Sequence, residues 1–100
     1  MADFCLTLLC PEALEEKLLD ALLMLPQVEV FTSVAIAAHG MAPERLSPAE
    51  QVLGRALGIQ AQVLLAAADK DQVLELLRRE FAGAGVRYWL TPVAQEGRFA

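Results

Sequence analysis

The segment HGMAPERLSPAEQVLGRALG, from His39 to Gly58, separates two apolar runs, VEVFTSVAIAA at 28–38 and IQAQVLLAA at 59–67. Along both runs, β-branched or large apolar residues recur at every second position, a period typical of strands. Neighbouring antiparallel strands need only about two to five connecting residues. We therefore expect the inserted segment both to form structure of its own and to serve as a binding element.

Outside this segment, the pattern indicates two more strands and two helices. The short apolar runs near the two ends of the chain are bounded by proline, which lacks the amide proton that a sheet ladder needs. Between them, leucines spaced three and four residues apart mark amphipathic helices. The expected elements are strands at 3–9, 28–38, 59–67 and 86–93, and helices from Pro11 to Leu25 and from Asp69, as the N-cap, to Gly83 or Gly85.

This order of elements predicts an α+β protein with the ferredoxin-like βαββαβ fold. The fold has a four-stranded antiparallel sheet with both helices on one face, and here a long insertion between the second and third strands. The other sheet face is left with Gln60 and Gln62 among apolar neighbours. We expect another subunit to cover it. Of Tyr88 and Trp89, one should lie under the helices and the other on this face.

Composition limits the classes of function. A chain of 100 residues that is 56% hydrophobic is expected to form a single domain, 1–100. Its net charge of −5, with acids and bases interspersed, argues against nucleic-acid binding. No apolar run reaches the about 18–20 residues that cross a bilayer, and the N-terminus lacks a signal-peptide pattern. We expect a cytoplasmic protein without direct membrane insertion.

The two cysteines, Cys5 and Cys10, are not expected to pair. Along an extended strand they would lie about 17 Å apart, on opposite faces. Reduced thiols agree with the cytoplasmic expectation.

Within the inserted segment, Ser47, Pro48 and Glu50 have the spacing of a helix start. Serine caps, proline occupies the first helical position, and glutamate three residues after the serine completes a capping box. The pattern predicts a short helix over 48–57. Gly54 interrupts it at about 1 kcal/mol, which makes this helix marginal and its order dependent on what it docks against.

Cys10, His39 and Met41 are the side chains that could hold a soft transition-metal ion, the one cofactor that the sequence suggests. In the predicted topology the ends of the first and second strands reach the same sheet edge, about 10 Å apart. The ion would need Met41 or another subunit to complete its site. The alternative is a structural role for His39.

Glu50 and Arg55 each have two interpretations. Glu50 either caps the short helix or contacts a ligand or partner. Arg55 either pairs with Glu50 or Glu44, or holds an anion or a partner carboxylate where Gly54 leaves the backbone open.

The segment resembles part of a known family. A strand that ends in His39 and Gly40, followed by Glu50, Gln51, Val52, Gly54 and Arg55, is similar to the small PII-like signalling proteins often encoded beside heavy-metal efflux systems. The resemblance implies a homotrimer with a T-loop-like insertion at 39–58. It also implies a regulatory or adaptor role, with a membrane efflux transporter or another regulatory protein as target. The binding residues that it implies are His39, Gly40, Met41, Glu50, Gln51, Gly54 and Arg55.

The chain departs from nucleotide-binding PII proteins at two turns. It has HGMAP after the second strand and AGAGVR before the fourth, and neither contains a lysine for phosphate. The sequence therefore does not favour ATP binding by the PII mode. No nucleophile with a neighbouring base and no phosphate loop is apparent, so no enzymatic activity is expected. A second hypothesis is direct soft-metal binding for tolerance, through Cys10, His39 and Met41.

Overall fold

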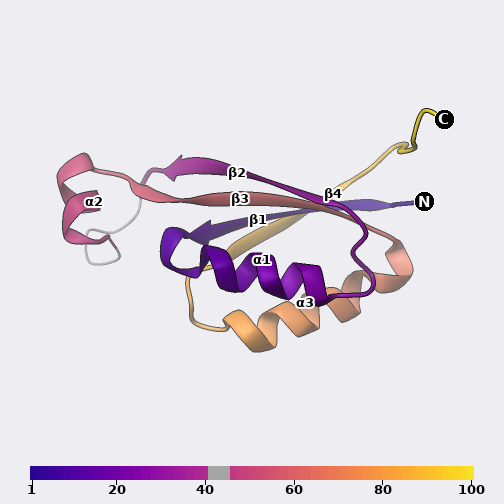
Figure 1. Ribbon diagram of the computed structural model, residues 1–100, viewed down its shortest axis with the longest axis horizontal. Coiled ribbons are helices and arrows are strands. Elements are labelled where there is room, and N and C mark those ends of the chain that lie inside the picture. The colour runs from indigo at the N-terminus through magenta and orange to yellow at the C-terminus, as the bar shows by residue number, and fades with distance from the viewer. Residues whose placement is uncertain (41–45) are drawn as a thin grey trace.

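The computed structural model describes residues 1–40 and 46–100, except for the side chains of Val52 and Leu53. Its elements are β1 (Phe4–Pro11), the 3-10 helix η1 (Glu12–Leu14), α1 (Glu15–Met24), β2 (Phe31–Ala38), α2 (Pro48–Leu53), β3 (Ala56–Leu65), α3 (Ala67–Phe81) and β4 (Arg87–Pro92). The strands form one antiparallel sheet in the order β2-β3-β1-β4, and α1 and α3 lie on one of its faces (Figure 1). The predicted ferredoxin-like arrangement is confirmed.

The inserted segment differs from its prediction at one end. α2 ends at Leu53 rather than at 57, because Gly54 adopts a left-handed φ of 71° and caps the helix. β3 then begins at Ala56, three residues earlier than the predicted start at 59. The glycine thus lies at the end of the helix and not in its interior.

The predicted boundaries of three other elements are also wrong. Pro11 still pairs within β1, so the first helix begins as η1 and becomes α1 only at Glu15. The second strand starts at 31 and not at 28, since the Val28 amide donates to the Leu25 carbonyl in a turn (3.1 Å). Asp69 is not the cap of α3: the helix begins at Ala67, whose amide donates to the carboxylate of Asp3 (2.7 Å).

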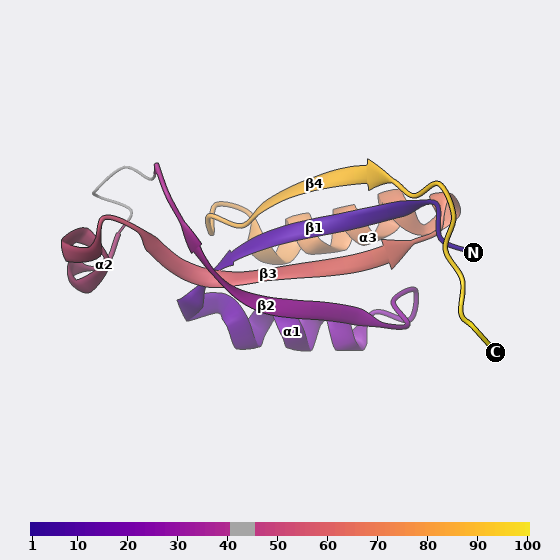
Figure 2. The same cartoon turned by 90° about the horizontal axis from the view of Figure 1, so that it is seen from above.

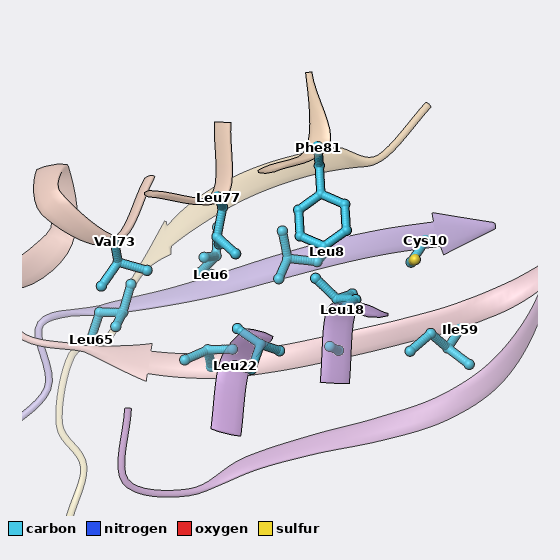
Figure 3. Packing of buried hydrophobic residues seen from close by; sticks show 12 residues of the cluster. Leu6, Leu8, Cys10, Leu18, Leu22, Ile59, Leu65, Val73, Leu77 and Phe81 are labelled. Atoms are coloured by element: carbon cyan, nitrogen blue, oxygen red, sulfur yellow. The ribbon is translucent and has the colours of Figure 1, made fainter. Parts of the chain in front are cut away.

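The core lies between the sheet and the two long helices. β1 and β3 alternate, so every second residue of each strand turns toward the helices. Figure 3 shows these side chains meeting those of α1 and α3. The buried cluster consists of Leu6, Leu8, Cys10, Leu18, Leu22, Ile59, Ala61, Val63, Leu65, Val73, Leu77 and Phe81.

The opposite sheet face, here called the open face, has no helix over it (Figure 2). Strand alternation and the pairing register place Val34, Gln62, Leu64 and Trp89 on this face. The three apolar members remain between 43% and 54% exposed. Tyr88 lies on the helix side, where it lines a cavity with Leu8 and Phe81. The predicted division of the two aromatic residues between the faces is confirmed, but Tyr88 is 49% exposed, so the expectation that one of them belongs to the core beneath the helices is wrong.

None of the helices formed by residues 1–40 and 46–100 has both the length and the hydrophobicity needed to cross a bilayer.

Candidate functional site

A cavity of about 700 Å³ lies at the end of the sheet where β1 and β2 finish and β3 and β4 begin. α2 projects beyond this end of the sheet (Figure 1). The cavity walls are largely apolar, with residues of the open face such as Leu9 and Ile36 contributing. The residues of its lining that can carry chemistry are Cys10, Glu12, His39, Ser47, Glu50 and Arg87.

The side chain of Glu50 links the start of α2 to β3. The predicted capping box is present: the Glu50 amide donates to the Ser47 hydroxyl (3.2 Å), and the Ser47 amide donates to Glu50 Oε1 (3.0 Å). The second carboxylate oxygen, Oε2, accepts from the Leu57 amide in β3 (2.6 Å). The hydrogen bond from the Ser47 amide, and after it the one from the Leu57 amide, hold the pKa of this carboxyl below its usual value.

This anchor predicts an acid-sensitive segment. Because the pKa of Glu50 is lower in the folded chain than in the unfolded one, its contribution is present above the unfolded pKa and is lost as the pH falls through the folded one. We expect the protection of the Ser47 and Leu57 amides, which donate to this carboxylate, against hydrogen exchange to decrease over that acid range. Glu50→Gln, which removes the ionisation, should abolish this pH dependence.

Glu29→Gln is the matched control, since Glu29 makes no hydrogen bond to any other described residue. Backbone amide exchange measured by NMR between neutral and acidic pH gives both protection factors. An acid dependence that survives in Glu50→Gln would assign it to another group.

Two other predicted loop residues, Gln51 and Arg55, differ in the contacts that they make. Gln51 supports α2, because its amide donates to the Ser47 carbonyl (2.8 Å) and its side chain donates to the Leu46 carbonyl (3.2 Å). Arg55 is exposed, and among the residues that the structure describes no carboxylate forms an ion pair with it. Pairing of Arg55 with Glu50 is not found, since the Glu50 carboxylate accepts from backbone amides.

His39 lines the cavity directly after β2, and Gly40 follows with a left-handed φ of 81°. Cys10 lines the same cavity from the end of β1, so the two predicted metal ligands do reach the same sheet edge. Met41 and Glu44 lie outside the described residues. Within residues 1–40 and 46–100, no group of three or more His, Cys, Asp or Glu side chains is placed to hold a metal ion.

The chemistry of Cys10 is that of a buried thiol. Its sulfur belongs to the core cluster (Figure 3) and donates to the Pro11 carbonyl (3.4 Å). Burial, and secondarily the charge of Glu15, raises the pKa of this thiol to about 11. A proton therefore stays on the sulfur near neutral pH, which disfavours both nucleophilic attack and metal ligation by a thiolate.

This property predicts slow alkylation of Cys10, one of two free cysteines. With iodoacetamide at pH 7.5, we expect Cys10 to react about a hundred times more slowly in the native protein than in guanidinium, because only the thiolate attacks. Peptide mass spectrometry measures the rate, and Cys5→Ser provides a background with one thiol. Equal rates with and without guanidinium would show that Cys10 is neither buried nor held protonated.

Sequence reasoning missed two contributors to the cavity. Arg87 is exposed in β4 and lines the cavity, and within the described part of the chain it forms no ion pair. Its position just after the glycine turn AGAG was the available signal. Gly58 is the second: a Cβ built there would overlap the carbonyl oxygen of Cys10. Only glycine permits this approach of β3 to the end of β1.

Comparisons with known proteins agree with this architecture. The family model described as "Protein of unknown function (DUF3240)" matches residues 1–100. The crystal structure of a DUF3240 family protein from Shewanella baltica matches with a TM-score of 0.80 at 18% identity, covering 100% of this chain and 99% of that chain. No curated protein matches the sequence.

Two further solved structures share the fold. A Thermus thermophilus protein assigned to the PII-like signalling class matches with a TM-score of 0.65 at 16% identity, covering 93% of this chain and 88% of that one. A Bacillus cereus protein related to NIF3 has a TM-score of 0.65 at 13% identity, covering 97% of this chain and 27% of its own. The chain therefore belongs to the DUF3240 family, and its ferredoxin-like fold is of the PII-like type.

Proposed function

We propose that this chain is a PII-like regulatory module whose segment 39–58 changes its order when a small molecule or ion occupies the cavity at its base. The observation that carries this proposal is the position of Glu50, which lines the cavity and is bonded to Ser47 and Leu57. A molecule in the cavity would lie against this anchor. Its binding would favour one conformation of segment 39–58, and the target protein would recognise that conformation.

Arg87 offers one binding point for a small organic anion. It forms no ion pair with a described carboxylate, and it lines the cavity together with the carboxylates of Glu12 and Glu50 and with apolar residues such as Leu9 and Ile36. A guanidinium binds carboxylate or phosphate through two parallel hydrogen bonds. Since neither turn near the cavity contains a lysine, we do not propose ATP binding by the PII mode.

Hydrogen exchange over residues 46–57 tests this function. The protein is titrated with ATP, ADP, Cu(I), Ag(I), Zn(II) and Co(II), and with citrate and inorganic phosphate as simple anions. We expect one of these probes to slow exchange in this segment, and Arg87→Ala to abolish the effect of an anion. Arg98→Ala, an exposed arginine outside the cavity, is the control. A probe that binds without changing exchange in the segment would contradict the coupling.

We further propose that copies of the chain assemble as a homotrimer through the open face. Its exposed apolar side chains, Val34, Leu64 and Trp89, lack a cover within the described chain. The face also carries Gln62, whose amide would find hydrogen-bond partners at a subunit contact. Burial of this face would account for the high apolar content of a small protein.

Trp89→Asp should therefore dissociate the assembly. A carboxylate within a buried apolar contact is strongly unfavourable. Trp89 is partly exposed in one copy, so the fold should survive the substitution. We expect the mass in solution to fall from trimer to monomer, with an unchanged far-UV circular dichroism spectrum. Leu23→Asp, on an exposed position of α1, should leave the mass unchanged. A Trp89→Asp protein of unaltered assembly would place the contact elsewhere.

A second candidate function is soft-metal binding for tolerance, because Cys10 and His39 line one cavity. The ion would have to displace the proton that burial keeps on the Cys10 sulfur. Met41 or another subunit would complete that site, and the efflux link implied by the sequence resemblance would make a membrane transporter the target. This candidate predicts stoichiometric uptake of Cu(I) or Ag(I) that His39→Ala abolishes. An affinity unchanged by His39→Ala would exclude it.

A further inference from the structure

A groove of about 350 Å³ runs between α1 and α3 on the side of the helices that faces away from the sheet. The two helices lie side by side along it (Figure 1). Its floor is apolar, formed by Ala21, Leu25, Leu76 and Leu77. Met24 lies at its edge and is 82% exposed, which leaves a flexible apolar side chain in water.

The rims of this groove are acidic. Asp20 stands on the α1 side and Glu80 on the α3 side, and neither carboxylate forms an ion pair or side-chain hydrogen bond with the residues that the structure describes. The one cation of the lining, Lys17, is already engaged: its Nζ donates to the Glu80 carbonyl (3.2 Å) and lies 5.1 Å from the centre of the Phe81 ring.

The nearby arginines lie outside the groove lining, where Glu75 forms ion pairs with both Arg78 (2.9 Å) and Arg79 (3.5 Å) on α3. A hydrogen bond to a carbonyl leaves the charge of Lys17 in place, so the lining carries two carboxylates and one ammonium. The groove therefore combines an apolar floor with a net negative charge.

We propose that this groove binds a basic amphipathic helix of a partner protein. Lys17, Asp20 and Met24 recur along α1 at the spacing of successive turns, so the groove follows the helix axis. The lining runs from Lys17 to Leu25 on the α1 side, about 12 Å, which accommodates two turns of a docked helix. Apolar side chains on one face of that helix enter the floor, and flanking lysines or arginines meet Asp20 and Glu80.

This inference is independent of the proposed function. The groove lies on the helix side of the sheet and the cavity at its end, so the groove stays accessible when the open face is covered. A cationic partner also agrees with the net charge of −5, which speeds encounter with a basic segment.

The test uses a fluorescent peptide of about 18 residues, with leucine at helical spacing and lysine elsewhere. We expect it to bind the full chain, measured by fluorescence anisotropy, and the double variant Asp20→Lys, Glu80→Lys to bind about tenfold more weakly. The charge-matched control is Glu29→Lys, Asp71→Lys, two exposed acids outside the groove. It should bind nearly as well as the unaltered protein.

Three results would overturn the proposal. The first is an equal loss in the control double variant, which would show attraction by net charge alone. The second is equal binding of a peptide in which glutamate replaces lysine. The third is assembly of the protein through this groove, detected as dissociation by Met24→Glu in sedimentation, since a second copy would then be the occupant. A folded Asp20→Lys, Glu80→Lys protein, checked by circular dichroism, keeps the comparison valid.

Discussion

Gly58→Ala is expected to destabilise the protein by about 3 kcal/mol, because the new Cβ overlaps the carbonyl oxygen of Cys10. That oxygen belongs to the backbone of β1, so no side-chain rotation can relieve the overlap. The two strands must separate where Gly58 pairs with Pro11 and also faces Ile36 of β2. Urea unfolding followed by circular dichroism measures the change in the free energy of unfolding.

Gly97→Ala is the matched control, since a Cβ at Gly97 meets nothing within 4 Å. Its effect should stay within about 0.5 kcal/mol. The shape of the cavity should also change in Gly58→Ala, because Gly58 is part of its wall. A Gly58→Ala protein as stable as the control would show that the strands are free to shift at this edge.

The second large effect is expected for Leu22→Ala, with a loss of about 3 kcal/mol in the free energy of unfolding. Leu22 is fully buried between α1 and the sheet (Figure 3), and truncation leaves a cavity that the sheet and α3 cannot close. The neighbouring residue gives the control: Leu23 is 71% exposed, so Leu23→Ala should change stability by less than about 0.5 kcal/mol. Similar losses for the two variants would mean that α1 does not pack through Leu22.

The fold could be predicted because its signals are local and mutually consistent. Apolar residues alternate along β2 and β3 and recur at helical spacing in α1 and α3, which identifies the buried face of each element. The order of the elements along the chain then allows few sheet topologies. The capping box at Ser47 and Glu50 could be found for the same reason, since it depends on four consecutive residues.

What the sequence could not predict depends on contacts between distant residues. Asp3, and not Asp69, accepts from the first amide of α3, across 64 positions of the chain. The hydrogen bond from the Leu57 amide to Glu50 exists only because α2 turns back at Gly54. The helical spacing of apolar residues also predicted that this helix continues to residue 57. Helix propensity does not show which backbone conformation Gly54 adopts.

For the candidate site, sequence reasoning found the segment but not the chemistry of its base. His39, Cys10 and Glu50 do line the cavity. The burial that protonates Cys10 follows from the packing of α1 and η1 over β1, which no local pattern encodes. Arg87 was overlooked because a single exposed arginine becomes informative only when the topology places the start of β4 beside the end of β1, at the end of the sheet where β2 also finishes.

The proposed assembly and ligand binding are best tested by native mass spectrometry of the unaltered protein. The protein is titrated with ATP, ADP, Cu(I), Ag(I), Zn(II), Co(II), citrate and phosphate, and one spectrum measures both the oligomeric state and the uptake of each probe. We expect a trimer that takes up one of these probes at one site per copy, with uptake of an anion lost in Arg87→Ala. A monomer or dimer that retains none of the probes would contradict the proposed function.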